Sequence, residues 1–514
     1  MRLLPVAVLL FLAGCQEPHH TYKEITMQAF SDMRMPAFVF DPQTIGRLLS
    51  DMAQTDKAAC ESDRRTCAFY RDSVHHLLWI DRAGADYRAD SLLAYLRGVE
   101  AIGMTPRSFG VEAIESDLQR LRTLQFDGGT NDLNHVAARL EYRLTKACLR
   151  YAYGQRFGFV NPHRVFNHLD VEKEDSVRRI TRYRGLFDMD MDLPEANYYE
   201  TVFSKISHDS LTVYLREIQP QNAFYKRLQG MLPTTNDADQ RQRILCNMER
   251  SRWRLKHPIP EQGKRIIVNI PAFHLYAYGQ DSVLDMRVVC GAIATKTPQL
   301  TSEVEWMEVN PQWVIPMSIL QKDVARRAGD SAYFARNRYQ IYDKETNTVV
   351  PVGSVSRSML LSGKYRVAQK SGSDNSLGRI VFRFKNRFSV YLHYTSSPWV
   401  FQREVRAISH GCVRVAKPFE LAEFLLDNPD EWLLDRIRIS MDLRPETDRG
   451  RQYLRTHADE KEHKLIGYVP VKPHVPVYVI YYTMWPDEQG VLQTWPDIYG
   501  YDRVLWNHLQ TYMQ

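Results

Sequence analysis

Two residues in the C-terminal half of the chain are of the types that form a nucleophile and its base. His393 follows Tyr391-Leu392, and Cys412 ends the short run Ser409-His410-Gly411-Cys412. A thiol has a free pKa of about 8.5 and attacks carbon efficiently only as the thiolate. A neighbouring imidazole can take the thiol proton and later return it to a leaving amine. The pair therefore predicts nucleophilic catalysis, with Cys412 as the nucleophile and His393 as the general base and acid.

The residues around Cys412 predict a tight turn. Gly411 lets the chain bend sharply, and the backbone N–H groups of Gly411 and Cys412 are expected to face a developing oxyanion. Ser409 and His410 are expected to shape this turn rather than to transfer protons. Cys290 lies in a predicted strand and is expected to be buried and inert.

The elements that must position these residues are mainly β-strands, which begin at about Glu261. Strands are predicted over 265–270, 273–278, 283–290, 304–309, 380–384, 388–393 and 437–441. Lys385-Asn386 predicts a hairpin between two of them, and 418–426 predicts a short helix. The more polar stretch 320–370 is predicted to be an insertion between two groups of strands, a common position for a lid.

Residues 25–258 are predicted to be mainly helical. Asn131–Tyr151 places apolar side chains at the spacing of one helix face, and Val111–Leu124 continues the pattern. A further helix is predicted over Asp90–Ile102, with Asp90 as its cap and Gly103 as its stop.

The run from His393 through Cys412 resembles the catalytic signature of the L,D-transpeptidases, a β-rich family of cell-wall enzymes with a nucleophilic cysteine. Other similar stretches are Val268-Asn269-Ile270-Pro271, Met286-Arg287-Val288-Val289, Thr297-Pro298, Asn310–Pro316, Asn375-Ser376-Leu377-Gly378 and Arg406-Ala407-Ile408. The long form of the family has a helical scaffold before the catalytic domain and a capping insertion within it. Asn247–Arg254 and the tail 476–500 resemble that form.

The resemblance implies an α+β multidomain protein with an N-terminal helical scaffold and a β-rich catalytic domain that carries a lid. The implied segments are a lipoprotein signal peptide at 1–14, a scaffold domain at 15–258, a catalytic domain at 262–445 with its capping insertion at 320–370, and a tail at 446–514 packing on the scaffold or the catalytic domain.

The resemblance also implies the reaction: a cysteine acyltransferase that joins two peptidoglycan stem peptides by 3-3 cross-links through a thioester. The family needs no cofactor, and carbapenem-type inhibitors are expected to bind. An L,D-carboxypeptidase using the same residues, or a non-catalytic wall-binding scaffold, stays open as an alternative. The intact pair of His393 and Cys412 argues against the non-catalytic alternative.

Substrate contacts are less clearly indicated than the catalytic pair. Arg414 is expected either to hold a substrate carboxylate or to form a structural ion pair. Tyr391 and Trp313 are expected to line the groove or the core. The chain departs from the family where Tyr394, Ser396 and Ala368 replace the usual Asp, Pro and Arg. Nor does any stretch resemble the peptidoglycan-binding module of many long members.

The N-terminus predicts export. The apolar run Leu3–Ala13 follows Arg2 and is too short to span a bilayer, as expected for a secretory signal. Its end, Leu12-Ala13-Gly14-Cys15, resembles a bacterial lipobox, in which Cys15 is lipidated. The prediction is a periplasmic lipoprotein anchored to a membrane, most simply the outer one. An ordinary cleaved signal is the alternative, and His19-His20 is expected to be polar tether.

Composition excludes several classes of protein. A net charge of +6 over 514 residues argues against a dedicated nucleic-acid binder. The chain is 44% hydrophobic and 25% charged, which excludes bulk disorder. Its cysteines and histidines lack zinc spacing, so no metal is predicted. Cys60 and Cys67 are either bridged or two turns apart on one helix, and the sequence allows both.

Overall fold

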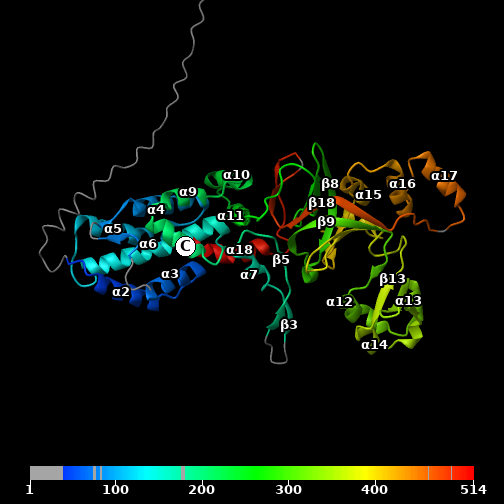
Figure 1. The fold of residues 1–514 in the computed structure, drawn as a ribbon, viewed down its shortest axis with the longest axis horizontal. Coiled ribbons are helices and arrows are strands. Elements are labelled where there is room, and N and C mark those ends of the chain that lie inside the picture. Colours follow the sequence, from blue (N-terminus) through cyan, green and yellow to red (C-terminus); the bar gives the residue numbers. More distant parts are fainter. Residues whose placement is uncertain are drawn as a thin grey trace, which may run out of the picture. The chain divides into compact units, whose positions relative to one another are not determined.

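The computed structural model describes residues 39–72, 77–81, 84–174, 180–460, 462–487 and 489–513. The predictions for Leu3–Ala13, Cys15, His19 and His20 lie outside these residues. The described chain forms two compact units (Figure 1). The helical unit comprises the residues up to Phe159, Leu193–Arg252 and the residues from Asn507 onward; the β-rich unit comprises Val160–Asp192 and Trp253–Trp506. The predicted α+β multidomain class is confirmed.

The helical unit is arranged around one long central helix. Its helices are α2 (Pro42–Thr55), α3 (Glu61–Asp72), α4 (Tyr87–Arg97), α5 (Val111–Thr123), α6 (Leu133–Phe157), α8 (Tyr198–Ser207), α9 (Leu211–Glu217), α10 (Ala223–Met231) and α11 (Ala238–Arg252). α6 packs against α2, α3, α4, α5 and α11. Asp132 caps its first turn by accepting a hydrogen bond from the His135 N–H. The helix predicted over Asn131–Tyr151 is therefore confirmed and continues to Phe157.

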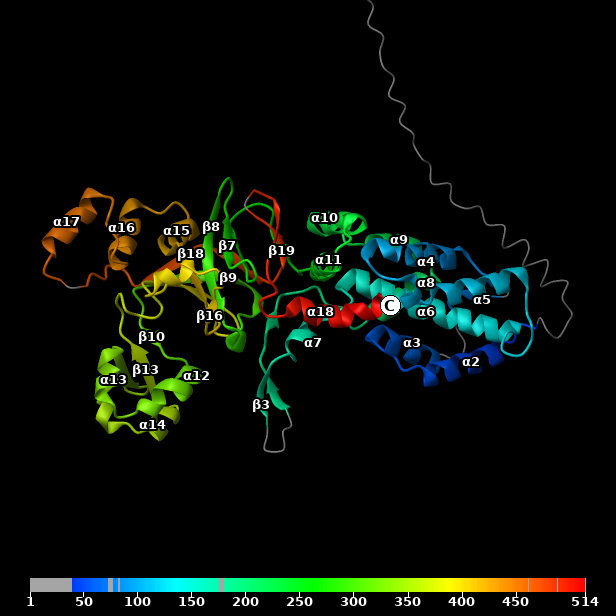
Figure 2. The same cartoon turned by 180° about the vertical axis from the view of Figure 1, so that it is seen from behind.

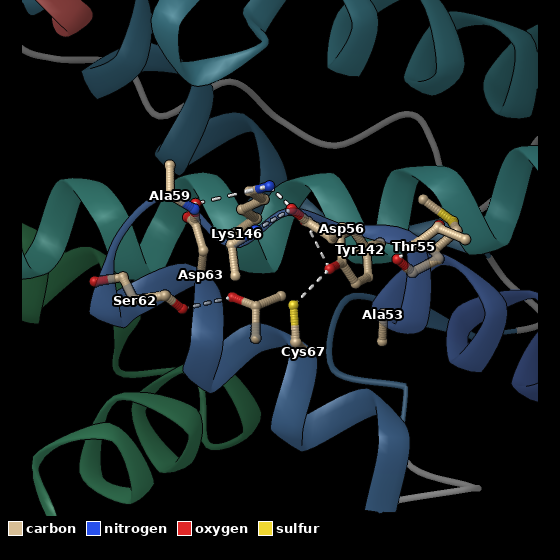
Figure 3. Close-up of polar contacts among 12 residues, drawn as sticks. Ala53, Thr55, Asp56, Ala59, Ser62, Asp63, Cys67, Tyr142 and Lys146 are labelled. Atoms are coloured by element: carbon tan, nitrogen blue, oxygen red, sulfur yellow. Dashed lines mark hydrogen bonds and ion pairs between the residues drawn. The ribbon is translucent and has the colours of Figure 1, made fainter.

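A polar cluster ties the connection between α2 and α3 to α6 (Figure 3). The Tyr142 hydroxyl donates to Asp56 at 2.9 Å, and Lys146 contacts the same carboxylate. The Cys67 sulfur lies 3.4 Å from that hydroxyl oxygen. Cys60, at the start of α3, and Cys67 are both free thiols, which answers the question that the sequence left open.

Two local predictions are wrong. The cap of α4 is Asp86, whose side chain accepts from the Arg88 N–H at 3.0 Å, whereas Asp90 lies in the first turn and pairs with Arg122. The strand predicted over 437–441 belongs to α16 (Glu431–Ser440), which starts at the cap residue Asp430. Alternating side chains over five residues mimic a strand, but the capped turn before them commits the segment to a helix.

The β-rich unit is built on a closed barrel. Its strands are β6 (Arg265–Asn269), β7 (His274–Tyr278), β8 (Val283–Gly291), β9 (Gln299–Val309), β14 (Ile380–Phe384), β15 (Leu392–His393), β17 (Val413–Val415) and β18 (Tyr468–Ile480). They are hydrogen-bonded in the order β14-β15-β17-β8-β7-β6-β18-β9, and β9 pairs back with β14. Two short strands extend the sheet: β5 (Phe187–Asp188) on β9, and β16 (Ala407–Ser409) on β8.

The two units alternate along the chain more often than the segments predicted from the sequence. β18, within the expected C-terminal tail at 446–514, closes the barrel by pairing in parallel with β6 and antiparallel with β9. Residues 160–192, placed in the scaffold by sequence, pack with the β-rich unit. The pairing of β18 and the packing of residues 160–192 both join segments far apart in the chain. A local hydrophobic pattern does not reveal such contacts.

Helices complete the β-rich unit outside the barrel. These helices are α7 (Pro162–Phe166), α15 (Pro418–Leu425), α16, α17 (Asp448–Thr456) and the start of α18 (Tyr501–Leu509) (Figure 2). α15 confirms the helix predicted over 418–426. In the part of the chain that the structure describes, no helix combines the length and the hydrophobicity needed to cross a membrane.

The insertion is a small folded body with its own sheet and core. Its elements are β10 (Trp313–Val314), α12 (Met317–Ile319), α13 (Ser331–Arg336), β11 (Tyr339–Asp343), β12 (Val349–Val350), α14 (Arg357–Leu361) and β13 (Tyr365–Gln369). The strands pair in the order β10-β13-β11-β12. Its core includes Ile315, Phe334, Ile341, Leu360 and Val367, each at most 4% exposed. The insertion therefore has a core of its own.

We expect the barrel to fold without the insertion. Val314 and Ala368 are direct antiparallel partners, so a short Gly-Ser linker can replace residues 315–367 without moving either neighbour. Circular dichroism should show cooperative melting within a few degrees of the full chain. As a control, Val477→Asp buries an unpaired charge in β18 at a fully buried position and should abolish that transition. A deletion variant that melts like the control would show that the barrel depends on the insertion.

Candidate active site

Parallel pairing of β15 with β17 places the predicted catalytic residues on one face of the sheet. Leu392 pairs with Val413 and His393 with Arg414. Because side chains alternate along a strand, His393 and Arg414 share the face opposite to Leu392 and Val413. Tyr391 and Cys412, each two residues before, lie at the adjoining positions of that face. The Val413 N–H donates to the Tyr391 carbonyl at 3.2 Å and extends the pairing to them.

The His393 ring is fixed through one of its nitrogens. Its Nδ1 lies 3.3 Å from the Leu377 carbonyl oxygen, so Nδ1 carries the proton and Nε2 keeps a lone pair. Leu377 is held in turn by Asn375, whose Oδ1 accepts the Leu377 N–H at 2.8 Å. The Asn375 amide also donates to the backbone carbonyl of Pro311 at 3.2 Å. Tyr394, where the family usually has Asp, leaves this arrangement in place.

Burial keeps His393 neutral. The side chain is 5% exposed, and burial, together with the charge of Arg414, lowers the pKa of His393 to about 3. The loss of hydration disfavours the imidazolium, and a nearby cation disfavours it further. The free site therefore presents a neutral imidazole over the whole physiological range.

Cys412 is half-buried and also neutral. Its thiol faces the Ser389 carbonyl oxygen at 3.9 Å. Burial raises the pKa of Cys412, although the Tyr391 hydroxyl and the charges of Arg383 and Arg414 act in the opposite direction. Burial therefore favours the protonated sulfur.

The turn before Cys412 is closed by Ser409. The Ser409 hydroxyl donates to the Cys412 carbonyl at 2.6 Å and accepts the Gly411 N–H at 3.2 Å. Gly411 has φ of 116°, which favours glycine. One expectation needs correction, because the Gly411 N–H is occupied by Ser409 and does not face an oxyanion. The exposed His410 side chain lies outside the buried part of the turn.

The Cys412 N–H is the backbone donor of the turn that adjoins the sulfur. Among the described residues, it donates no hydrogen bond. The Gly411 carbonyl, on the same peptide unit, accepts the Thr297 hydroxyl at 2.9 Å. The Ser409 carbonyl accepts from the Ala292 N–H at 2.9 Å and the Thr295 hydroxyl at 2.8 Å. The segment after β8 therefore supports the turn at both ends.

Two guanidinium groups give the site a positive potential. Nε of Arg414 is buried without a hydrogen-bond partner, and none of the ion pairs formed by the described residues involves Arg414. The expected structural ion pair is therefore not formed here. Arg383 lies 4.4 Å above the Tyr391 ring and makes two hydrogen bonds of 3.1 Å to Glu308. Arg414 thus retains capacity for an anion, whereas Arg383 is already paired.

Tyr391 and Trp313 belong to the same region. Burial raises the pKa of Tyr391 above its ordinary value, and the Trp313 indole acts in the opposite direction. Trp313 starts the first strand of the insertion and is partly buried. The structure thus brings together Tyr391, His393, Cys412 and Arg414, with Trp313 beside Tyr391. Cys290 is buried at 0% exposure, and burial raises its pKa to about 12, consistent with an inert thiol.

Several supporting residues are not predicted as site residues by the sequence. Arg383, Leu377, Thr295 and Thr297 contact site residues or the turn, and Tyr499 contacts Thr297. Thr297-Pro298, Asn375–Gly378 and the tail 476–500, which contains Tyr499, are family-like stretches. This resemblance is the signal in the sequence that points to three of them. Within the described ranges no group of three or more His, Cys, Asp or Glu side chains is placed to hold a metal ion.

The neutral pair predicts a high apparent pKa for the reaction of Cys412 with iodoacetamide. Burial raises the pKa of the thiol, so the alkylation rate should keep rising through pH 9.0. No inflection is expected between pH 6 and 7, because the pKa of His393 is about 3. Arg414→Gln should move the curve to still higher pH. Peptide mass spectrometry assigns the label, with Cys412→Ala as the control. A plateau below pH 8 would instead indicate a preformed thiolate.

Comparisons with known proteins agree with this geometry. A scaffold-domain model matches residues 64–232, and a model described as the L,D-transpeptidase catalytic domain matches residues 263–439. A curated relative from Haemophilus influenzae, named "Putative L,D-transpeptidase", is 28% identical over 333 residues. The alignment spans 62% of this chain and 62% of the relative. The chain therefore combines a scaffold domain with a catalytic domain of the L,D-transpeptidase family.

Proposed function

We propose that this protein is an active L,D-transpeptidase that joins two peptidoglycan stem peptides by a 3-3 cross-link. The observation that carries the proposal is the shared sheet face of His393, Cys412 and Arg414, inside the segment that matches the catalytic domain. A thiol and a neutral imidazole can carry out peptide acyl transfer, and a guanidinium can hold a substrate carboxylate.

The first half-reaction forms a thioester with the donor peptide. The Cys412 thiol turns from the Ser389 carbonyl towards the free nitrogen of His393, which takes its proton. The sulfur then attacks the donor carbonyl, and the Cys412 N–H stabilises the resulting oxyanion. The carbon–nitrogen bond breaks, and the leaving amine takes the proton from His393.

The second half-reaction transfers the acyl group. The acceptor amine attacks the thioester carbonyl and gives a proton to His393. The carbon–sulfur bond breaks, and the proton returns to the Cys412 sulfur. If water replaces the amine, the same steps release a shortened stem peptide, which is the L,D-carboxypeptidase outcome. A site that excludes water therefore favours cross-linking.

Substrate binding strengthens the base. The Arg414 charge is one of the causes that lower the pKa of His393, second to burial. A substrate carboxylate paired with Arg414 cancels that charge and raises the pKa of His393. The same pairing also removes a charge that lowers the pKa of Cys412, so the pKa values of the base and the thiol shift in the same direction.

The insertion is part of this proposal as a lid. Trp313 joins it to Tyr391 at the edge of the site, and its independent core allows it to move as one body. The variant that lacks residues 315–367 should give more hydrolysis relative to cross-linking, because water then reaches the thioester more easily. An unchanged product ratio would show that the insertion does not control access to the thioester.

The catalytic assignment is tested by muropeptide analysis of purified wall incubated with the protein. Cys412→Ala should form no 3-3 cross-links, and His393→Ala should lose at least about a hundredfold in rate because general base catalysis is removed. Cys60→Ala, which removes a thiol from the helical unit, is the matched control and should act like wild type.

Each outcome of this assay distinguishes the alternatives. Shortened stem peptides without cross-links would identify a carboxypeptidase on the same residues. Wall binding with no product and no carbapenem labelling of Cys412 would identify a non-catalytic scaffold. Activity in a folded Cys412→Ala protein would contradict the assignment of the nucleophile.

The proposed place of action is the periplasm, with the protein held to the outer membrane through a lipid on Cys15. The supporting feature is the lipobox-like Leu12-Ala13-Gly14-Cys15 after a short apolar run. Wild type should sediment with membranes, whereas Cys15→Ala should move to the soluble fraction, because the acyl chains supply most of the membrane affinity. Equal partitioning of the two proteins would indicate an ordinary secreted enzyme.

A further inference from the structure

The peptide unit between Gly411 and Cys412 is held from its carbonyl side. The Gly411 carbonyl oxygen accepts a hydrogen bond of 2.9 Å from the Thr297 hydroxyl. In a planar trans peptide the C=O and the following N–H point in opposite directions. Fixing the carbonyl towards Thr297 therefore fixes the Cys412 N–H on the other side of the peptide.

This peptide would otherwise have little preference for one orientation. Gly411 has φ of 116° and no side chain to resist rotation of the neighbouring peptides. A Cβ atom added at Gly411 would come no closer than 3.7 Å to its nearest neighbour, the Thr295 carbonyl oxygen, so crowding does not hold the turn. A reversed peptide would present the carbonyl oxygen, instead of the N–H, to the reacting carbonyl. The Thr297 hydrogen bond opposes that reversal.

Thr297 is itself fixed by the C-terminal part of the chain. Its backbone N–H donates to the Tyr499 hydroxyl oxygen at 3.2 Å, and its side-chain oxygen accepts the Gly291 N–H at 2.8 Å. The Tyr499 hydroxyl donates to the Gly291 carbonyl at 2.6 Å. Thr297 is fully buried and Tyr499 is 7% exposed, so water does not compete for these bonds.

Tyr499 is anchored behind this contact. Its backbone N–H donates to the Tyr481 hydroxyl oxygen at 2.9 Å, and that hydroxyl donates to Asp497 at 2.6 Å. The rings of Tyr481 and Tyr499 stack with centroids 5.8 Å apart. A continuous series of hydrogen bonds thus runs from Asp497 through two tyrosines and Thr297 to the turn that carries Cys412.

We infer that Thr297 and Tyr499 are positioning residues that orient the Cys412 N–H as the oxyanion donor. The inference rests on the proposed acyl-transfer function and assigns the orienting role to the segments after β8 and β18. Neither residue touches the substrate. They act through the Gly411–Cys412 peptide.

The test compares two reactions of the same sulfur in the full-length protein. Attack on a carbapenem converts the lactam carbonyl oxygen into an oxyanion, after which the carbon–nitrogen bond breaks and the nitrogen is protonated. Alkylation by iodoacetamide displaces iodide and forms no oxyanion. A misoriented N–H should therefore slow the first reaction and spare the second, whereas a disordered site alters both.

Thr297→Val removes the hydroxyl and keeps the shape of the side chain. Carbapenem acylation, followed by intact mass spectrometry, should slow by about tenfold to a hundredfold, somewhat less than the loss of an entire oxyanion donor. Iodoacetamide alkylation should stay within about twofold of wild type at the same pH. Thr297→Ser retains the hydroxyl and should restore most of the acylation rate.

Tyr499→Phe tests the next contact and covers the case in which Thr297→Val does not fold. It should slow acylation in the same selective way but by a smaller factor, because Thr297 keeps its own bond to Gly411. Tyr501→Phe is the matched control. Its hydroxyl is buried in the same tyrosine stack and has no hydrogen-bond partner among the described residues, so both reactions should match wild type.

The outcomes separate this inference from the proposed function. A wild-type protein that resists carbapenem acylation while Cys412 is alkylated would overturn the proposed acyl transfer, and the inference with it. Normal acylation in both folded Thr297→Val and Tyr499→Phe would overturn the inference alone. Equal loss of acylation and alkylation in both variants would assign Thr297 and Tyr499 to general folding instead.

Discussion

The parallel pairing of β15 with β17 is the contact on which the site depends. It sets His393 opposite Arg414 and thereby places the imidazole, the thiol and the guanidinium on one face. A shift of one residue in this register would turn half of these side chains to the other face of the sheet, because side chains alternate along each strand. The closed barrel fixes the register, since both strands have a partner on their other edge, β14 for β15 and β8 for β17.

Burial within this arrangement favours the neutral forms of both His393 and Cys412. The same loss of hydration raises the pKa of Cys412 and lowers that of His393, so neither group is charged before a ligand arrives. The charge of Arg414 adds to the cost of an imidazolium. The protonation of the pair therefore depends on what occupies the site.

The support of the nucleophile comes from distant parts of the chain. Ser409 closes the turn locally, whereas Thr295 and Thr297 follow β8, and Tyr499 follows β18. β18 also closes the barrel between β6 and β9. The C-terminal residues are thus part of the catalytic unit in two ways: they complete its sheet and they brace its active-site turn. Among the described residues, those that form or support this face all belong to the β-rich unit.

The sequence by itself predicted the type of chemistry and the residues proposed to carry it, and it determined most of the local elements. Ser409-His410-Gly411-Cys412 and His393 identify the site because the motif is local, and hydrophobic periodicity identifies α6 and most barrel strands for the same reason. Only the tertiary structure joined β18 and Tyr499 to the site and showed that Arg414 forms no ion pair with the described residues. These features depend on contacts between residues far apart in the chain, which no local pattern records. The Gly411 N–H donates to Ser409, and Asp430 caps the helix that contains residues 437–440. Both bonds are local, but the residue types alone do not fix the side-chain orientations that they require.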